Sequence, residues 1–172
     1  ILAHAQYYRE EWEEARQSFH HALQLHPYDW TALIGRATLH CDRNFYVAAL
    51  LDIERVIDVD DQEAAPFALR ANIHLTRGQH AEALRDYQYT LESDPDDDEA
   101  RLQLARLQAL TGNTSIALEL LEPLLESPED IEEEYFVPAA LLRSQLSLTL
   151  GSVKPALQDA QSVVEQCPTE PW

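Results

Sequence analysis

The sequence predicts an all-α protein made of about five helical hairpins that repeat along the chain. The first observation is that the segment 64–97 matches its neighbours when it is moved by 34 residues in either direction. One step back, the recurring residues are Arg36, Ala37, His40, Arg43, Ala49, Leu50, Asp52 and Asp60, which match Arg70, Ala71, His74, Arg77, Ala83, Leu84, Asp86 and Asp94. One step forward, Ala105, Gly112, Ala117 and Leu125 fall on Ala71, Gly78, Ala83 and Leu91. A period of this length is typical of helical repeats, each of which buries its apolar face against its neighbours.

The second observation is an alanine that stands at one place in the second helix of every repeat. These alanines are Ala15, Ala49, Ala83, Ala117 and Ala156, with spacings of 34, 34, 34 and 39 residues. Aligning on them divides residues 1–172 into one array with repeats at approximately 1–29, 30–63, 64–97, 98–131 and 132–172. The longer last spacing indicates an insertion within 128–138. We expect it to extend the following helix upstream, which places Pro138 inside that helix and bends it.

The third observation concerns the turn between the two helices of a repeat. Gly78, Gly112 and Gly151 occupy the same place in three repeats, and Asn44 fills it in the second. Glycine, followed by asparagine, adopts a left-handed backbone conformation at least cost, so a turn is expected at each of these places.

The remaining boundaries follow from the segments between repeats. HPYD (26–29), VDDQE (59–63), SDPDDDE (93–99) and SPED (127–130) each offer Asp or Ser as a helix N-cap, with acids near the first turn. The expected helices are, in order, 1–9, 12–25, 30–42, 46–59, 64–76, 80–93, 98–110, 114–126, 129–149 and 153–167.

These repeats resemble the tetratricopeptide repeat, whose 34-residue pattern includes A-x3-F followed by a proline. The first repeat supplies Ala15-x3-Phe19 and Pro27, and the third supplies Ala83-x3-Tyr87 and Pro95. The resemblance covers essentially the whole chain. It implies a right-handed α-superhelix (solenoid) of antiparallel helix pairs that acts as a non-enzymatic scaffold for binding peptides or proteins.

Composition excludes several classes of partner. Asp and Glu number 31 against 12 Lys and Arg, and the net charge of −19 repels a phosphate backbone, so nucleic acid is not expected to bind. No run approaches the roughly 18 apolar residues of a membrane span.

Cys41 and Cys167 belong to repeats expected to be too far apart for a disulfide, and two free thiols favour a reducing compartment such as the cytoplasm. Because the chain opens at Ile1 inside a first helix, we expect it to be a fragment.

Two sets of polar residues recur with the repeat. Arginine and aspartate stand 16 residues apart in three repeats, while the fourth has Leu104 and Leu120 at those places; the pairs are Arg36 with Asp52, Arg70 with Asp86, and Arg143 with Asp159. We interpret them as ion pairs between the two helices of a repeat rather than as part of a binding groove. His40 and His74 are also equivalent, but the next places are Gln6 and Gln108, so we expect packing histidines and no metal site. No catalytic motif is present, so no cofactor is expected and no enzyme activity is predicted.

The resemblance also implies where a partner would bind, because in this family the first helices line the inner, concave surface. The residues it places there are Tyr7, Tyr8, Thr38, Cys41, Asn72, Leu75, Leu102, Arg106, Ala109, Leu141, Gln145 and Leu148. Few of these are charged, and only Asn72 and Arg106 correspond to the basic and amide side chains with which some family members grip a C-terminal carboxylate. We therefore expect an uncharged, partly apolar protein or peptide segment.

Two alternatives remain open at this stage. Small acidic repeat proteins that resemble this one act as secretion-type chaperones, which shield apolar segments of client proteins. The last helix also presents Leu157, Ala160 and Val164 on its apolar side, and terminal repeats normally need a polar cap. We therefore expect either further helices after Trp172 or self-association through this helix.

Overall fold

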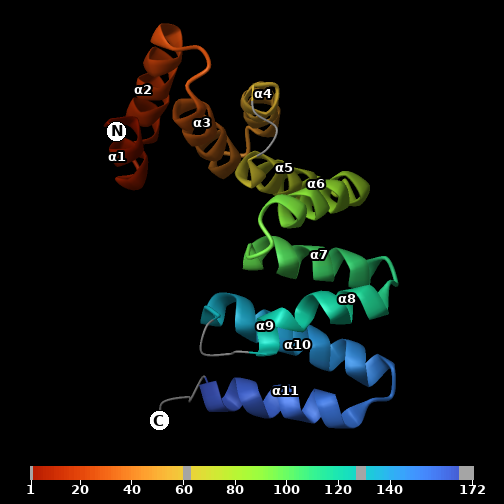
Figure 1. Ribbon diagram of the computed structural model, residues 1–172. Helices are drawn as coiled ribbons and strands as arrows, with labels where there is room; N and C mark the ends of the chain where they lie inside the picture. The colour runs from red at the N-terminus through yellow and green to blue at the C-terminus, as the bar shows by residue number, and fades with distance from the viewer. Residues whose placement is uncertain (1, 60–62, 127–130, 167–172) are drawn as a thin grey trace. The chain divides into compact units, whose positions relative to one another are not determined.

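The computed structural model describes residues 2–59, 63–126 and 131–166, and these residues form helices joined by short turns (Figure 1). The helices are α1 (Leu2–Tyr8), α2 (Trp12–Leu25), α3 (Trp30–Asp42), α4 (Tyr46–Ile57), α5 (Ala64–Thr76), α6 (His80–Ser93), α7 (Asp98–Leu110), α8 (Thr114–Leu121), α9 (Pro123–Glu126), α10 (Glu133–Thr149) and α11 (Val153–Gln166). No strand occurs within these ranges. The all-α class and the alternation of first and second helices are confirmed.

The chain forms two compact units, Ile1–Pro95 and Asp96–Trp172. In the first unit, α1 pairs with α2, α3 with α4, and α5 with α6, while α2 packs on α3 and α4 on α5. In the second unit, α7 pairs with α8 and α10 with α11, and α10 also packs on α7, α8 and α9. The organisation of all five repeats as a single array stays a prediction.

The turns between paired helices have the expected left-handed backbone. Gly78, Gly112 and Gly151 have φ values of 70°, 86° and 73°, and Asn44 has 61°. After the turn at Gly78 the next backbone N–H, that of Gln79, bonds back to the carbonyl of His74 at 2.8 Å. The first repeat has the same turn although its residue there is Glu10, with φ of 60°. The glycine pattern did not predict a left-handed conformation at this residue.

Aspartates begin two of the first helices as predicted. The Asp29 carboxylate accepts a hydrogen bond from the backbone N–H of Ala32 at 2.9 Å, and Asp97 accepts one from Ala100 at 2.8 Å. These bonds satisfy N–H groups that have no partner within the helix. The other two expected caps are not found. The N-caps of α5 and α10 are Glu63 and Glu132, and neither side chain makes a capping hydrogen bond; α10 therefore begins at Glu133 instead of at 129, and the Asp and Ser residues expected to cap these helices lie at 60–62 and 127–130, outside the described residues.

Two prolines distinguish the fourth and fifth repeats from the others. The helix expected over 114–126 is interrupted, because α8 ends at Leu121 and the short α9 begins at Pro123; proline cannot donate the helical hydrogen bond, and its ring clashes with the preceding turn. The insertion lengthens the next first helix as expected, since α10 has 17 residues against 13 in α7, with Pro138 inside it.

The alanines that align the repeats are buried in the interior. Ala15, Ala49, Ala83 and Ala117 have no exposed surface, and Ala156 is also buried. Between them lie larger buried side chains, among them Phe19 in the first unit, and Leu121 and Phe136 in the second. The fourth glycine, Gly35, is buried in α3 beneath Phe19, where a Cβ atom would lie 2.5 Å from the ring. Each unit therefore has its own apolar interior, and this packing determines which residues of the first helices face outward.

Candidate functional site

The first-helix positions predicted to bind a partner fall in both compact units. In the first unit, α1 contacts α3 and α3 contacts α5, so the predicted residues on these helices belong to neighbouring elements. They are Tyr7 and Tyr8 on α1, Thr38 and Cys41 on α3, and Asn72 and Leu75 on α5. Tyr8 is exposed and the other five are half-buried. This surface combines aromatic, aliphatic and small polar side chains.

Tyr7 is held in place from several sides. Its hydroxyl donates a hydrogen bond to the Asp42 carboxylate at 2.5 Å, and its ring meets the edges of Tyr8 and Trp12 at centroid distances of 5.4 Å. Partial burial, together with this hydrogen bond and the charge of Asp42, raises the pKa of Tyr7 to about 12. Tyr7 therefore stays neutral at physiological pH and links α1 to the end of α3.

The polar side chains of this surface also have roles within the fold. The fully buried Tyr87 hydroxyl donates to Oδ1 of Asn72, which ties α5 to α6. The Thr38 hydroxyl donates to the carbonyl of Ile34 at 3.0 Å within its own helix. Burial and the charge of Asp42 raise the pKa of the Cys41 thiol to about 11, so the thiol is protonated at neutral pH. Cys41 is a free cysteine, as predicted, whereas Cys167 lies outside the described residues.

In the second unit, the predicted residues differ in exposure. Leu141 and Leu148 on α10 are 56% and 55% exposed, and Gln145 between them is also exposed. On α7, Arg106 is exposed and donates to the side chain of Gln103 at 3.3 Å, and Ala109 is half-buried. Leu102, by contrast, is buried in the apolar cluster of this unit, so it supports the surface instead of presenting a side chain to solvent.

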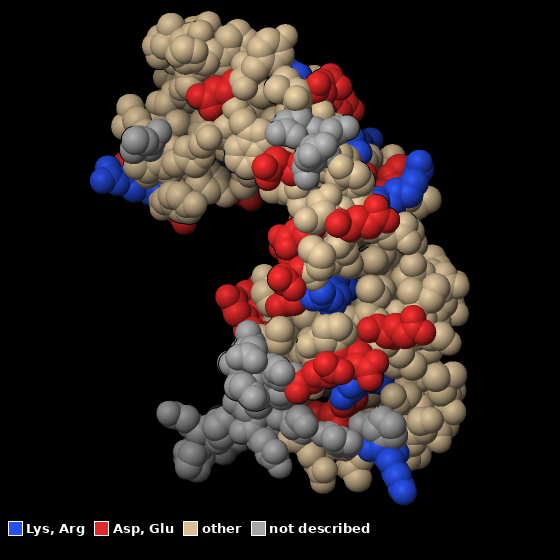
Figure 2. Space-filling model, viewed as in Figure 1, with Lys and Arg blue, Asp and Glu red and all other residues tan. Residues whose placement is uncertain are grey.

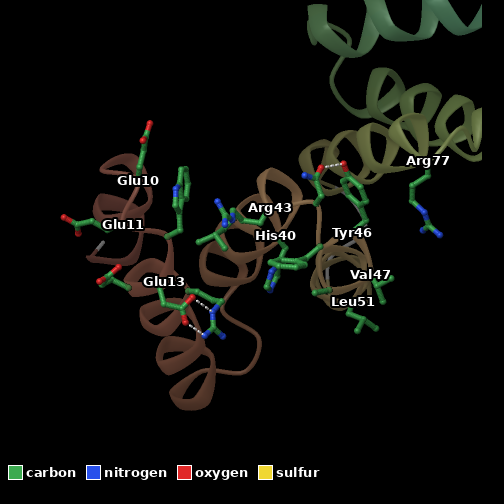
Figure 3. A pocket seen from close by; sticks show the side chains of 16 residues that line it. Glu10, Glu11, Glu13, His40, Arg43, Tyr46, Val47, Leu51 and Arg77 are labelled. Carbon is green, nitrogen blue, oxygen red and sulfur yellow. Dashed lines mark hydrogen bonds and ion pairs between the residues drawn. The ribbon is translucent and has the colours of Figure 1, made fainter.

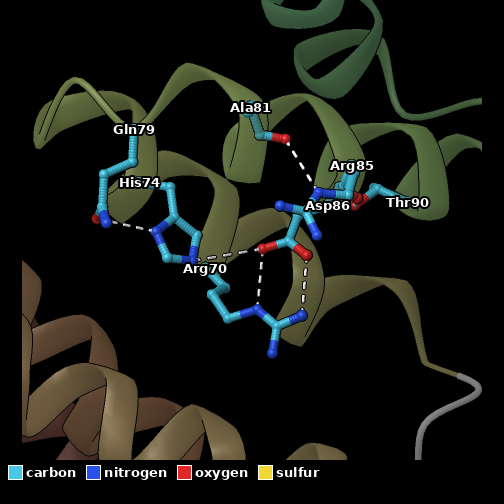
Figure 4. A network of polar contacts seen from close by, with 7 residues as sticks. All are labelled: Arg70, His74, Gln79, Ala81, Arg85, Asp86 and Thr90. Carbon is cyan, nitrogen blue, oxygen red and sulfur yellow. Dashed lines mark hydrogen bonds and ion pairs between the residues drawn. The ribbon is translucent and has the colours of Figure 1, made fainter.

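The recurring arginine and aspartate residues form ion pairs across the second, third and fifth hairpins, as predicted. Arg70 donates from Nε and Nη2 to the two carboxylate oxygens of Asp86, both at 2.8 Å (Figure 4). Arg36 and Asp52 make the same two-bonded contact at 2.8 and 2.7 Å. Arg143 and Asp159 pair in the fifth repeat. Because each pair joins two helices of one repeat, its role is structural.

The equivalent histidines have different surroundings. His74 lies 3.8 Å from the Asp86 carboxylate through Nε2, and its Nδ1 is 3.1 Å from the side-chain oxygen of Gln79 (Figure 4). His40 instead lies edge to face with Phe45, and its buried Nδ1 has no hydrogen-bond partner. Burial lowers the pKa of His40. Within the described part of the chain, no group of three or more His, Cys, Asp or Glu side chains is arranged to hold a metal ion.

One hollow on the first unit was not predicted from the sequence. The outer groove, as we call it, has a volume of about 1180 Å³ and lies among the start of α2, the end of α3 and the start of α4 (Figure 3). Its lining residues are Glu10, Glu11, Trp12, Glu13, Glu14, Arg16, Leu39, His40, Arg43, Asn44, Phe45, Tyr46, Val47, Ala48, Leu51 and Arg77. The apolar residues at the start of α4 are the feature of the sequence from which this groove could have been predicted.

The charge of the chain is displayed on its surface. Acidic side chains cover more of the face seen in Figure 2 than basic ones do, consistent with the net charge of −19. None of the described helices is both long enough and apolar enough to span a bilayer.

Comparison with known proteins agrees with this architecture. Residues 74–136 match the family model of the tetratricopeptide repeat. The fold of the chain is that of a tetratricopeptide repeat solenoid. Among solved structures, MamA is similar with a TM-score of 0.81 at 13% identity, and the alignment covers 96% of this chain and 94% of MamA. No curated protein sequence matches the chain.

Two further tetratricopeptide repeat structures are similar to the chain. YrrB, described as having an unusual peptide-binding site, is 20% identical with a TM-score of 0.76, and the alignment covers 98% of this chain and 84% of YrrB. The first such domain of Spaghetti (RPAP3), bound to the HSP90 peptide SRMEEVD, is 20% identical with a TM-score of 0.60. That alignment covers 63% of this chain and 87% of the domain. At these identities the likeness shows the fold alone.

Proposed function

We propose that the chain is a non-enzymatic scaffold that binds a segment of a partner protein on the concave surface formed by its first helices. The observation that carries this proposal is the chemistry of the exposed first-helix positions. In a chain of net charge −19, these positions present Tyr8, Leu141, Gln145 and Leu148, with Arg106 as the charged exception. Apolar side chains in pockets, together with amides that bond a peptide backbone, suit an extended or helical segment.

The same residues favour a largely uncharged partner. The peptide bound to the Spaghetti domain, SRMEEVD, has three acidic side chains. In our chain Asn72 and Arg106 are the two candidates for gripping such a peptide, and Oδ1 of Asn72 already accepts a hydrogen bond from Tyr87. An acidic ligand would also be repelled by the overall charge. The proposed partner is therefore partly apolar, and the outer acids contribute solubility and weak steering.

Two leucines at the end of α10 give a matched test of this surface. Leu148 is a proposed contact residue, while Leu150, two residues further along, is 59% exposed and lies outside the proposed surface. A peptide selected from a random display library against the chain should bind Leu148→Glu at least about tenfold more weakly, and Leu150→Glu about as tightly as the native chain. Equal effects of the two substitutions would contradict the proposal.

Substitutions in the first unit and a salt titration extend this test. Leu75→Glu and Asn72→Ala should both weaken binding, with thermal melts as a control because Asn72 also supports Tyr87. Affinity should change little between low and moderate salt, because apolar contacts are not screened. Collapse of binding with salt, with both substitutions neutral, would place the site on the acidic exterior.

The secretion-type chaperone is the alternative function, and self-association through α11 is an additional possibility for the partner. Co-expression with an aggregation-prone client separates the two functions, because a chaperone raises the solubility of its client whereas a scaffold leaves it unchanged.

A further inference from the structure

The outer groove of the first unit combines an apolar floor with charged residues around it. Leu39 is buried and Trp12 half-buried at its base, while Phe45, Val47 and Leu51 are 58%, 69% and 58% exposed. Val47 and Leu51 are four residues apart on α4 and therefore lie on the same side of the helix. Phe45 immediately precedes α4 and lies edge to face with His40. We call these three exposed apolar side chains of the groove lining the apolar strip.

The apolar strip is specific to the second repeat. At the places of Phe45, Val47 and Leu51, the first repeat has Glu11, Glu13 and Gln17; the third has Gln79, Ala81 and Arg85; the fourth has Asn113, Ser115 and Glu119; and the fifth has Ser152, Lys154 and Gln158. Solvent-facing positions of a repeat are expected to be polar or small, as they are in these four. Three large apolar residues at the same places in one repeat indicate a surface that a partner covers.

Acidic side chains gather on one side of the groove. Glu10, Glu11, Glu13 and Glu14 line the side formed by the start of α2, where Arg16 pairs with Glu13. Arg43 at the end of α3 lies between this side and α4, and Arg77 lies beyond Val47 and Leu51, as Figure 3 shows. A ligand that crosses the groove therefore meets an acidic wall at one end.

We propose that the outer groove binds an amphipathic helical segment of a partner protein, whose apolar side chains contact Phe45, Val47 and Leu51 and whose Lys or Arg residues face the glutamates at the start of α2. The volume of about 1180 Å³ accommodates several side chains from one face of a helix, spaced i, i+3 or i+4, and i+7. A phosphate-rich ligand would be repelled by the four glutamates on the α2 side, of which only Glu13 is paired with an arginine. A second copy of this chain, of net charge −19, does not supply the basic end that the groove requires.

This site differs from the first-helix surface in its residues. The end of α3 lines the outer groove, but none of the predicted first-helix contact residues does. The two surfaces also differ in chemistry, since the outer groove selects for basic residues and the first helices do not.

The test starts from a display library of amphipathic helical peptides with randomised exposed positions, selected against the full chain. We expect enriched peptides to combine apolar residues at helical spacing with Lys or Arg clustered at one end. The most enriched peptide, carrying a fluorescent label, is then titrated with the native chain and its variants, and anisotropy gives the dissociation constant.

The decisive variant is Val47→Glu with Leu51→Gln, which copies the residues Glu13 and Gln17 of the first repeat and so should fold normally. It should weaken binding of the peptide by more than about tenfold, even though the added glutamate increases the attraction for a basic ligand. Leu25→Glu, at an exposed leucine at the far end of α2, adds the same charge and should leave the affinity unchanged.

A second variant tests the acidic wall. Glu10→Gln with Glu14→Gln should weaken binding of the peptide about threefold to tenfold and reduce the salt dependence of binding. These substitutions leave the Arg16–Glu13 pair in place. Failure to enrich any peptide, enrichment without basic residues, or equal affinity for the Val47→Glu, Leu51→Gln chain would overturn the proposal. Self-association that this double substitution abolishes would also overturn it, because a second copy would then occupy the groove.

Discussion

Replacing Arg70 alone with leucine should destabilise the chain more than replacing Arg70 and Asp86 together. Asp86 is buried, and its carboxylate receives both bonds from Arg70 and lies near His74 (Figure 4). Arg70→Leu leaves this carboxylate without its main partner. Removing one member of a buried ion pair costs about 3–5 kcal/mol.

The size of each effect follows from the exposure of the two side chains. The Asp86 side chain is 10% exposed, but that of Arg70 is 24% exposed, so we expect the lower end of the range for Arg70→Leu, about 3 kcal/mol. Asp86→Leu should cost about 2 kcal/mol or less, because the long arginine side chain can turn its guanidinium to water. The double substitution imitates Leu104 and Leu120 of the next repeat and should cost about 1 kcal/mol.

Chemical denaturation of the four proteins at neutral pH measures these free energies of unfolding. Arg85→Leu is the matched control, because Arg85 is exposed on the same helix as Asp86 and bonds only weakly to the carbonyl of Ala81, at 3.3 Å; it should change stability by no more than about 0.5 kcal/mol. The two single substitutions should be non-additive by at least about 2 kcal/mol. Additivity within about 0.5 kcal/mol would refute the structural role assigned to the pair.

Three further predictions concern a histidine, a glycine and the last helix. Burial holds the pKa of His40 below its usual 6.5, so the unfolded chain binds the extra proton and stability should fall as pH drops from about 7 to about 5; denaturation curves should show a shallower fall for His40→Gln, and an unchanged slope would contradict this. Gly35→Ala should cost about 1–3 kcal/mol in the same assay because its Cβ would meet the Phe19 ring, and Phe19→Leu should offset part of that cost. Leu157 and Val164 are exposed on α11, so any self-association seen by sedimentation should decrease in Leu157→Lys, and an unaffected oligomer would exclude this helix as the interface.

Helix positions could be predicted well because one pattern specifies them several times. For α3, α5, α6 and α7 the expected and observed ranges coincide, since an aligned alanine, a turn residue and an inter-repeat segment limit each helix independently. The Arg36–Asp52 and Arg70–Asp86 pairs were predictable for a related reason. Their charges are replaced together by leucines in the fourth repeat, which indicates contact without any structural information.

Other features depend on neighbours that one repeat does not specify. Pro123 lies at a place where the other second helices continue, so the alignment favoured an unbroken helix over the local effect of proline. Glu10 adopts a glycine-like conformation because the surrounding hairpin closes in the same way as the others. Gly35 lies within α3, away from the turn that the other glycines share.

The candidate site was predictable only in part for the same reason. Leu102 occupies a first-helix place equivalent to that of the exposed Leu141, but the helices packed around it bury it. The outer groove depends on the spacing between α2 and α4, whereas its apolar strip at Phe45, Val47 and Leu51 was present in the sequence.

Hydrogen exchange of the chain with a bound peptide tests the central claim, partner binding on the first helices, most directly. The peptide should be selected against the Val47→Glu, Leu51→Gln chain, so that the outer groove does not contribute. Mass spectrometry then measures hydrogen exchange separately for the first and the second helices of the repeats. Slower exchange in α3, α5, α7 and α10 on binding, with α4, α6 and α8 unchanged, is the predicted result. Protection confined to the second helices, with α5 and α10 unchanged, would contradict it.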